Sequence, residues 1–299
     1  MTTATKADDP AVDKPTLAPR PTNSLSPSRA GDFLTCGLLY RLRVIDQIPE
    51  APGEAAARGT LVHAVLEKLF DHPAQERTET LAAELLTPSW QELRASDPLT
   101  ASVLFGSPTA WEDHLAGKEL PAPDADAEAA FVGNAKSFLT KYFRMEDPQR
   151  LEPHQREVPV SVTLPSGLTL RGVVDRVDKA PTGQVRVVDY KTGRAPGEGW
   201  ESKAMFQMRF YGLVWWLLTS ELPSRLQLLY LGNEQTLAID PTEEQLLATQ
   251  KKLESIGAAI TKATERQEWR PRKSKLCSWC SFKPLCPEWG GTTPPLPVV

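Results

Sequence analysis

Runs of β-branched residues in the middle of the chain predict three consecutive strands. Residues 157–164 alternate between hydrophobic and polar side chains, and residues 168–178 and 184–190 form two further apolar runs. The segment Pro181-Thr182-Gly183, between the last two runs, has the composition of a tight turn. Strands joined by a tight turn pair as antiparallel neighbours, so the pattern predicts a β-meander.

Helical periodicity surrounds these strands. Ser26 followed by Pro27 is typical of a helix start, and Cys36 is one of the apolar positions that recur with helical spacing after it. Further helices are predicted over residues 54–70, 201–219 and 240–263, and further strands over residues 226–231 and 236–239. The order is helices, three strands, a helix, two strands and a helix, which indicates an α/β protein.

The composition divides the chain into one folded domain with flexible ends. Residues 1–24 are rich in Pro, Thr and charged residues, which predicts a disordered tail. Residues 25–289 are expected to form the domain, with a helical insertion over residues 71–147, where prolines interrupt the helical pattern. Basic residues and cysteines gather in residues 265–289, the expected cluster-binding segment, and residues 290–299 are expected to be a flexible tail.

Length and composition indicate a soluble globular protein. With 299 residues, of which 40% are hydrophobic, the chain can bury a sizeable core. It has no apolar run of membrane-spanning length and no secretory signal pattern, so a cytoplasmic location without a membrane partner is expected. The net charge is −4, but residues 1–149 carry 14 Lys and Arg against 22 Asp and Glu, whereas residues 150–299 carry 20 against 16. Any nucleic-acid surface should therefore lie mainly in the second half.

Two carboxylates and one amine converge on the predicted hairpin. Asp175 lies within the first strand, and Asp189 and Lys191 end the second strand on one face, two residues apart. The surplus negative charge suits a hard divalent cation such as Mg²⁺, which binds carboxylates and leaves positions for a phosphate. A lysine can orient or deprotonate water and offset charge on a phosphodiester. An isolated Asp-x-Lys is more often a surface salt bridge, but the other motifs of the chain favour the metal site.

Together these motifs resemble the RecB-like branch of the PD-(D/E)XK nuclease superfamily, which includes CRISPR-associated RecB-family exonucleases and iron-sulfur, AddB-like members. The resemblance spans roughly residues 24–287. His63 matches the family's helix histidine, and Gly172 to Asp175 match its G-x-x-D strand. Asp189 to Lys191 match the D/E-x-K strand, and Gln207 with Tyr211 match the Q-x-x-x-Y helix. The resemblance implies a restriction-endonuclease-like α/β core, with a mixed central sheet flanked by helices.

The resemblance also implies roles for the residues of the site. One or two Mg²⁺ or Mn²⁺ ions would be held by His63, Asp175, Asp189 and the backbone carbonyl of Tyr190. Lys191 would activate water, while Gln207 and Tyr211 would position the scissile strand. Glu157, on the preceding strand, either faces this site or is solvated. Basic residues expected to contact DNA phosphates are Arg58, Arg209, Arg270, Arg272, Lys273 and Lys275.

The chain contains four cysteines, which are Cys36 near the start of the fold and Cys277, Cys280 and Cys286 near its end. In a cytoplasmic protein the Cys-x2-Cys spacing indicates a metal site rather than disulfides. Zinc normally uses two short-range pairs of ligands. One distant and three close cysteines resemble the iron-sulfur members of the family, which implies a [4Fe-4S] cluster with zinc as the alternative. The metal would tie the first helix to the C-terminal segment, shielded by Trp279 and Phe282.

The function implied is that of a metal-dependent DNA nuclease, an exonuclease in DNA repair, recombination or DNA-end processing. The same motifs would serve a nuclease that trims ends in CRISPR spacer acquisition, or a non-catalytic DNA-end-binding scaffold. Intact Asp175, Asp189 and Lys191 argue against the scaffold. The sequence has no G-x-x-x-x-G-K-[ST] motif, so ATP-driven unwinding would require a separate helicase as partner.

Overall fold

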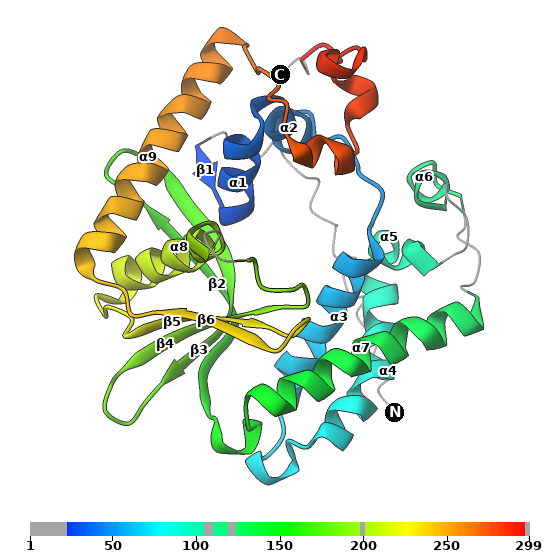
Figure 1. Ribbon diagram of the computed structural model, residues 1–299, viewed down its shortest axis with the longest axis vertical. Helices are drawn as coiled ribbons and strands as arrows, with labels where there is room; N and C mark the ends of the chain where they lie inside the picture. Colours follow the sequence, from blue (N-terminus) through cyan, green and yellow to red (C-terminus); the bar gives the residue numbers. More distant parts are fainter. Residues whose placement is uncertain (1–22, 105–109, 119–123, 198–200, 297–299) are drawn as a thin grey trace, which may run out of the picture.

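The sheet that the sequence predicts lies at the centre of the molecule, with helices on both of its faces (Figure 1). The computed structural model describes residues 23–104, 110–118, 124–197 and 201–296. Within these residues six strands form one sheet, and their bounds are β1 Ser24–Leu25, β2 Pro153–Thr163, β3 Thr169–Lys179, β4 Val185–Lys191, β5 Arg225–Tyr230 and β6 Gln235–Ile239. The order along the sheet is β1-β3-β4-β5-β6, and β2 pairs with β3.

The sheet mixes parallel and antiparallel pairs, as the α/β prediction requires. β3 pairs antiparallel with both β2 and β4, which confirms the predicted meander, and Gly183 in the turn adopts a positive φ of 88°. β5 runs parallel to β4, and helix α8 (Glu201–Thr219) makes the crossover between them. β6 returns antiparallel to β5.

The short strand β1 includes Ser24, the last residue of the predicted disordered tail. Ser24 pairs with Thr169 of β3 in parallel, and both residues of the strand are buried. Residues 1–22 of the expected tail lie outside the described residues. Two residues are too few to leave an alternating pattern, so this strand could not be predicted from the sequence.

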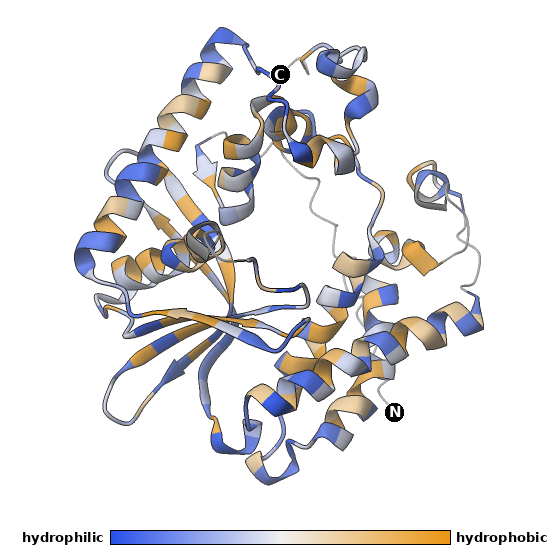
Figure 2. Cartoon of the chain, in the orientation of Figure 1, coloured by the Kyte–Doolittle hydropathy of each residue, from blue (hydrophilic) through white to orange (hydrophobic). Residues whose placement is uncertain are grey.

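One face of the sheet is covered by α1 (Pro27–Thr35), α8 and α9 (Glu243–Arg266) (Figure 1). α9 begins with a reciprocal cap, in which the Thr242 hydroxyl accepts from the Gln245 N–H and the Gln245 side chain accepts from the Thr242 N–H. Figure 2 shows α9 as mainly hydrophilic with interspersed hydrophobic positions, as expected for a helix that packs on the core with one side. The larger hydrophobic core lies here and includes Val174, Met208, Leu213, Leu228 and Leu253.

The opposite face of the sheet is covered by α3 (Glu54–Leu69), α4 (Glu79–Ser96) and α7 (Ala125–Met145). A second core cluster joins these helices to the sheet through Val188, Tyr190 and Leu229. Residues 71–147, expected as an insertion, thus supply much of the core on this face. None of the described helices is long and apolar enough to cross a membrane.

The remaining helical segments are short. They are the helices α2 (Gly37–Tyr40), α5 (Pro98–Ala101) and α6 (Ala110–Leu115), a π-helical turn Arg41–Ile45, and 3-10 turns at Ala74–Glu76, Ser102–Leu104, Pro148–Arg150, Lys275–Trp279, Lys283–Leu285 and Pro287–Trp289. The last three turns surround the C-terminal cysteines. Near them Phe282 packs against Leu38 and Leu42 in a third, small core cluster.

The two ends of the described chain meet beside α1 and α2. Cys36 does not lie within a helix, although the helical spacing predicts it; the residue adopts an extended backbone between α1 and α2, with φ −163° and ψ 123°. Residues 290–299, expected to be flexible, are held in place at least in part. Arg41 Nη2 donates to the Pro294 carbonyl at 2.5 Å, and Leu296 packs against the larger core. Residues 297–299 lie outside the described residues.

Candidate active site

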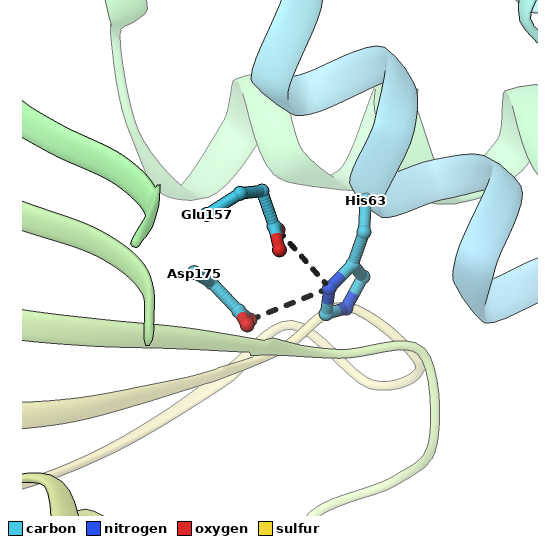
Figure 3. Close-up of side chains that lie close together, drawn as sticks. All are labelled: His63, Glu157 and Asp175. Atoms are coloured by element: carbon cyan, nitrogen blue, oxygen red, sulfur yellow. Dashed lines mark ion pairs between the residues drawn. The ribbon is translucent and has the colours of Figure 1, made fainter. Parts of the chain in front are cut away.

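Helix α3 directs His63 towards the sheet, where it meets Asp175 of β3 and Glu157 of β2 (Figure 3). His63 Nδ1 lies 3.4 Å from Asp175 Oδ2 and 4.0 Å from Glu157 Oε1. On the other side of the ring, Nε2 lies 3.0 Å from the carbonyl oxygen of Tyr190. With its proton on Nε2, the ring donates to this carbonyl and presents the lone pair of Nδ1 to the two carboxylates. One ligand atom from each of the three side chains lies within 4.8 Å of the other two, which suits a shared cation.

Glu157 reaches this site at an irregular point of β2. Its two neighbours in β2 pair with the two neighbours of Asp175 in β3, so Glu157 lies across from Asp175. Its φ of 42° is uncommon for a residue with a side chain, and such strain is of order 1–3 kcal/mol. Burial, followed by the charges of Asp175, Glu67 and Asp189, raises the pKa of Glu157 to about 7. Glu157 therefore faces the site, which the sequence left open.

Asp189, near the end of β4, is almost fully buried, with 1% of its surface exposed. Its Oδ1 accepts a hydrogen bond from Gln207 Nε2 at 2.7 Å, and its Oδ2 lies 2.6 Å from Lys191 Nζ. This short, charge-assisted contact engages Oδ2, so both carboxylate oxygens of Asp189 have partners from the chain itself. Desolvation, followed by the charge of Asp175, raises the pKa of Asp189 to about 7, although Lys191 opposes the shift. A nearby cation would favour the ionised form of this acid.

Tyr190 fixes the relative positions of these groups. Its N–H donates to Asp175 Oδ2 at 2.8 Å, and its carbonyl, the predicted metal ligand, contacts His63. Its phenol oxygen accepts from Arg176 Nη1 at 2.5 Å. Arg176 is 1% exposed and forms ion pairs with Glu146 at 2.9 Å and Asp178 at 3.0 Å. Removing one partner of such a buried network costs about 3–5 kcal/mol, so the network holds β4 firmly behind the site.

Gln207 and Tyr211 reach the site from α8, one helical turn apart. Gln207 Nε2, which donates to Asp189, also lies 3.5 Å from the Tyr211 hydroxyl. A Cβ atom on Gly172 would lie 2.8 Å from the Tyr211 ring, so the glycine of the Gly-x-x-Asp motif makes room for this side chain. Burial, followed by the charge of Asp189, raises the pKa of Tyr211, which keeps the phenol protonated as a hydrogen-bond donor.

The donor set fits a hard divalent cation. Carboxylate oxygens of Asp175 and Glu157 and an imidazole nitrogen converge there. Burial, followed by the charges of neighbouring carboxylates, raises the pKa of Glu157 and of the adjacent Asp189. A bound dication would favour the ionised form of these acids. Sequence reasoning did not find the buried supports Arg176 and Glu146, because their roles follow from long-range packing. The antiparallel pairing of the two predicted strands could have placed Glu157 opposite Asp175, but the sequence alone did not give the register of the pair.

The four cysteines line one pocket, together with apolar side chains such as Leu38. The Cys36 sulfur accepts a hydrogen bond from the Arg272 backbone N–H at 3.3 Å. The backbone N–H of Ser274 donates to the Cys277 sulfur at 3.4 Å and lowers the pKa of this thiol, whereas burial raises the pKa of Cys280. In the part of the chain that the structure describes, no three of these sulfur atoms lie within 4.8 Å of one another.

The two aromatic residues expected to shield the cysteines, Phe282 and Trp279, differ in burial. Phe282 is buried in the third core cluster beside Cys280 and Cys286. Trp279 is 80% exposed, which contradicts the prediction that it covers the site. Trp279 lies on a 3-10 turn whose side chains point to solvent over most of its length.

The basic residues expected to contact DNA do not share one surface. Arg209 lines a groove beside Lys191 and Gln207. The other five predicted DNA contacts are not among the described residues that line this groove. Arg58 is paired with Glu54 on α3 at 2.8 Å. Arg272 and Lys273 line the cysteine pocket, and exposed positions are also found for Arg270 and Lys275.

Comparisons with known proteins agree with this architecture. A crystal structure of a protein named "Putative exonuclease" from Eubacterium rectale is similar over 87% of both chains, with 14% identity and a TM-score of 0.53, which shows a shared fold. The crystal structure of SSO0001 is 17% identical over 55% of this chain and 72% of that chain, with a TM-score of 0.35. No curated protein sequence matches the chain. The sequence profile of the PD-(D/E)XK nuclease superfamily matches residues 24–287, and the chain therefore belongs to this superfamily.

Proposed function

We propose that the protein is a divalent-metal-dependent deoxyribonuclease of the RecB-like branch, acting as an exonuclease in DNA-end processing during repair or recombination. The observation that carries the proposal is the convergence of His63, Asp175 and Glu157 next to the buried Asp189 and its partly exposed partner Lys191. Membership of the superfamily supports hydrolysis of phosphodiester bonds. The name of the structural neighbour from Eubacterium rectale supports the exonuclease assignment.

The site would take Mg²⁺ or Mn²⁺, since oxygen-rich donor sets favour these ions. His63 Nδ1, Asp175 and Glu157 would hold the ion. The Tyr190 carbonyl and Asp189 Oδ2, which were predicted as further donors, contact His63 Nε2 and Lys191 and would have to exchange these partners for the ion. When bound, the ion polarises the phosphodiester and makes water a better nucleophile. Tyr190 keeps Asp175 in place through its N–H, so the donors are positioned before the ion arrives.

Two side chains would act on the substrate itself, and a third would position Asp189. Lys191 Nζ, held by Asp189 at 2.6 Å, would orient the attacking water and donate to a phosphate oxygen. The protonated hydroxyl of Tyr211 would donate to the scissile strand. Gln207 would keep Asp189 in the orientation that points Oδ2 away from α8, because it already occupies Oδ1.

The cysteine pocket would hold a [4Fe-4S] cluster. Its donor set is four thiols, and backbone N–H groups already donate to two of the sulfur atoms, as is common around iron-sulfur clusters. The two alternatives differ in what the thiols bind, since each cysteine of a [4Fe-4S] cluster binds a different iron, whereas four thiolates would share one zinc ion. The cluster would join α1 to the C-terminal segment.

A degradation assay tests the proposed function. Linear DNA labelled at one end and closed circular DNA of the same sequence are each incubated with the protein and Mg²⁺. An exonuclease removes the label from the linear DNA and leaves the circle intact, whereas an endonuclease cuts both. Because the chain has no ATP-binding loop, activity without ATP is expected, and unwinding of long duplexes would come from a separate helicase.

Lys191→Met gives the matched inactive control. This change removes the amine and keeps most of the apolar stem, so the protein should fold but lose activity by at least about 100-fold. A protein that leaves both DNA forms intact with Mg²⁺ and with Mn²⁺, yet binds DNA ends, would be a non-catalytic scaffold and would refute the proposal.

A further inference from the structure

We propose that the groove beside the site binds single-stranded DNA, with Phe206 as the stacking surface for one base and Lys252 as a phosphate contact. This inference rests on the proposed nuclease function and specifies the form of DNA that reaches the site. The groove has a volume of about 1240 Å³. Its lining includes Lys191, Gln207 and Tyr211, so it is continuous with the residues proposed to act on the substrate.

Three helices and the C-terminal segment form the walls of the groove. α1, α8 and α9 lie together on one face of the sheet (Figure 1), and each contributes lining residues. Ser274 and Leu276 extend the lining towards the cysteine pocket. A bound strand would therefore run along one face of the molecule, from the catalytic end of β4 towards the C-terminal segment.

The charge of the groove is opposite to that of the whole chain. Four basic residues line it, namely Lys191, Arg194, Arg209 and Lys252, and the described residues of the lining include no Asp or Glu. Lys191 is paired with Asp189, but the other three form no ion pair with any described acid. A chain with a net charge of −4 thus presents unpaired cations beside its acidic site, and such a surface attracts a polyanion.

Phe206 gives the groove an aromatic face next to these cations. Its ring is partly buried, and Lys252 Nζ lies 4.9 Å from the ring centroid. A cation–π contact at an exposed position contributes about 0.5–1 kcal/mol. Stacking of a base on an aromatic side chain contributes about 1–3 kcal/mol. A base can therefore replace the ammonium on the ring, while Lys252 moves to the adjacent phosphate.

This combination selects a single strand over a duplex. A basic surface alone would hold the phosphates of either form. The bases of an intact duplex are stacked on one another, so they offer no free face to Phe206. A single strand presents both phosphates and base faces, which is the pattern that sequence-independent single-strand sites use.

A binding assay without divalent metal separates this inference from catalysis. Fluorescence anisotropy is measured with a labelled single-stranded oligothymidylate of about 15 nucleotides, in buffer with EDTA. Phe206→Leu should weaken binding about tenfold, because the lost stacking amounts to about 1.4 kcal/mol. Lys252→Ala should also weaken it, and should lower the slope of log K against log salt by about 0.7, the value for one phosphate contact on a single strand. Phe206→Leu should leave this slope unchanged.

Lys251→Ala is the matched control, because Lys251 is the exposed neighbour of Lys252 on α9 and is not among the described residues of the groove. Its affinity should stay within about twofold of the wild type, since a cation away from the path loses no phosphate contact. Equal effects of Lys251→Ala and Lys252→Ala, or equal affinity for the single strand and its duplex, would overturn the inference. Circular dichroism of each variant verifies the fold.

The two proposals fail in different ways. If the single strand binds as described but no DNA is cleaved with Mg²⁺ or Mn²⁺, the groove assignment stands and the nuclease proposal falls. If the protein cleaves DNA while Phe206→Leu and Lys252→Ala bind and cleave like the wild type, the nuclease proposal stands and the groove assignment falls.

Discussion

Among single residues, Glu157 and Asp189 have pKa values well above those of ordinary surface acids. Burial and neighbouring carboxylates raise the pKa of each to about 7. Ionising them therefore costs folding free energy unless a cation is present. The sequence predicted Asp189 from its spacing to Lys191, but it did not predict the burial of Asp189, which depends on α8 covering the end of β4.

We expect the metal-free protein to lose stability as the pH rises from about 4.5 to about 7. Over this window an unfolded glutamate, with an ordinary pKa of 4.5, releases its proton first, whereas the folded Glu157 keeps it. The folded state then binds more protons, so stability falls with pH. Glu157→Gln should flatten this decline. Mg²⁺ should raise the melting temperature of the wild type more at about pH 8 than at about pH 5.5.

Thermal unfolding in EDTA across this pH range, followed by circular dichroism, measures the effect. Glu84→Gln is a suitable control, since Glu84 lies exposed on α4. An identical decline in the wild type and Glu157→Gln would show that Glu157 is not an acid that the folded site keeps protonated.

At the level of elements, local signals predicted much of the fold. The predicted helices 54–70 and 201–219 correspond to α3 and α8 within one residue, because periodicity and capping are local properties. The strand β1 and the extended backbone at Cys36 escaped prediction, since both depend on contacts with distant parts of the chain. The pairing of His63 with the acids was likewise inferred from the family resemblance, because it requires α3 to pack on the sheet.

Close packing between β3 and α8 leads to a prediction for Gly172→Ala. The added methyl group would meet the Tyr211 ring at 2.8 Å, so the ring and the neighbouring Gln207 must move. Overpacking of this kind costs about 1–3 kcal/mol. We expect the loss of cleavage, about tenfold or more, to exceed what this destabilisation explains, because a misplaced positioning group lowers kcat. Urea denaturation and single-turnover cleavage measure the two effects.

Gly133→Ala provides the comparison for that variant. Gly133 lies on the exposed side of α7, and a Cβ there would meet nothing within 4 Å. Alanine should stabilise this helix by about 0.5–1 kcal/mol and leave cleavage unchanged. Full activity in Gly172→Ala would show that the position of Tyr211 does not matter for the reaction.

For the whole molecule, the sequence predicted where charge and cysteines would lie. The four cations of the groove all belong to the second half of the chain, where the charge distribution placed any nucleic-acid surface. Cysteines from both ends of the fold line one pocket, while the shared metal that the resemblance implies there stays a prediction. The path of the groove could not be predicted, because it depends on how α1, α8 and α9 pack together.

Anaerobically purified protein should be brown and contain about four irons per chain. Cys36→Ala should lose the cluster, destabilise the whole protein and expose residues 265–296 to protease, because the metal joins α1 to the C-terminal segment. Ser278→Ala, a change of an exposed side chain between two of the cysteines, should retain iron and stability. Iron analysis, absorbance and limited proteolysis test this. A colourless, equally stable Cys36→Ala protein that keeps one zinc on the other three cysteines would contradict a shared cluster.

The proposed nuclease activity requires that the acids around His63 hold a divalent ion. Isothermal titration with Mn²⁺, combined with cleavage assays on the same samples, tests it most directly. The wild type should bind Mn²⁺ and cleave DNA, and Asp175→Asn should lose both by at least about tenfold. Asp126→Asn, which changes an exposed acid on α7, should lose neither. Mn²⁺ binding and cleavage that are the same in Asp175→Asn as in the wild type would contradict the account.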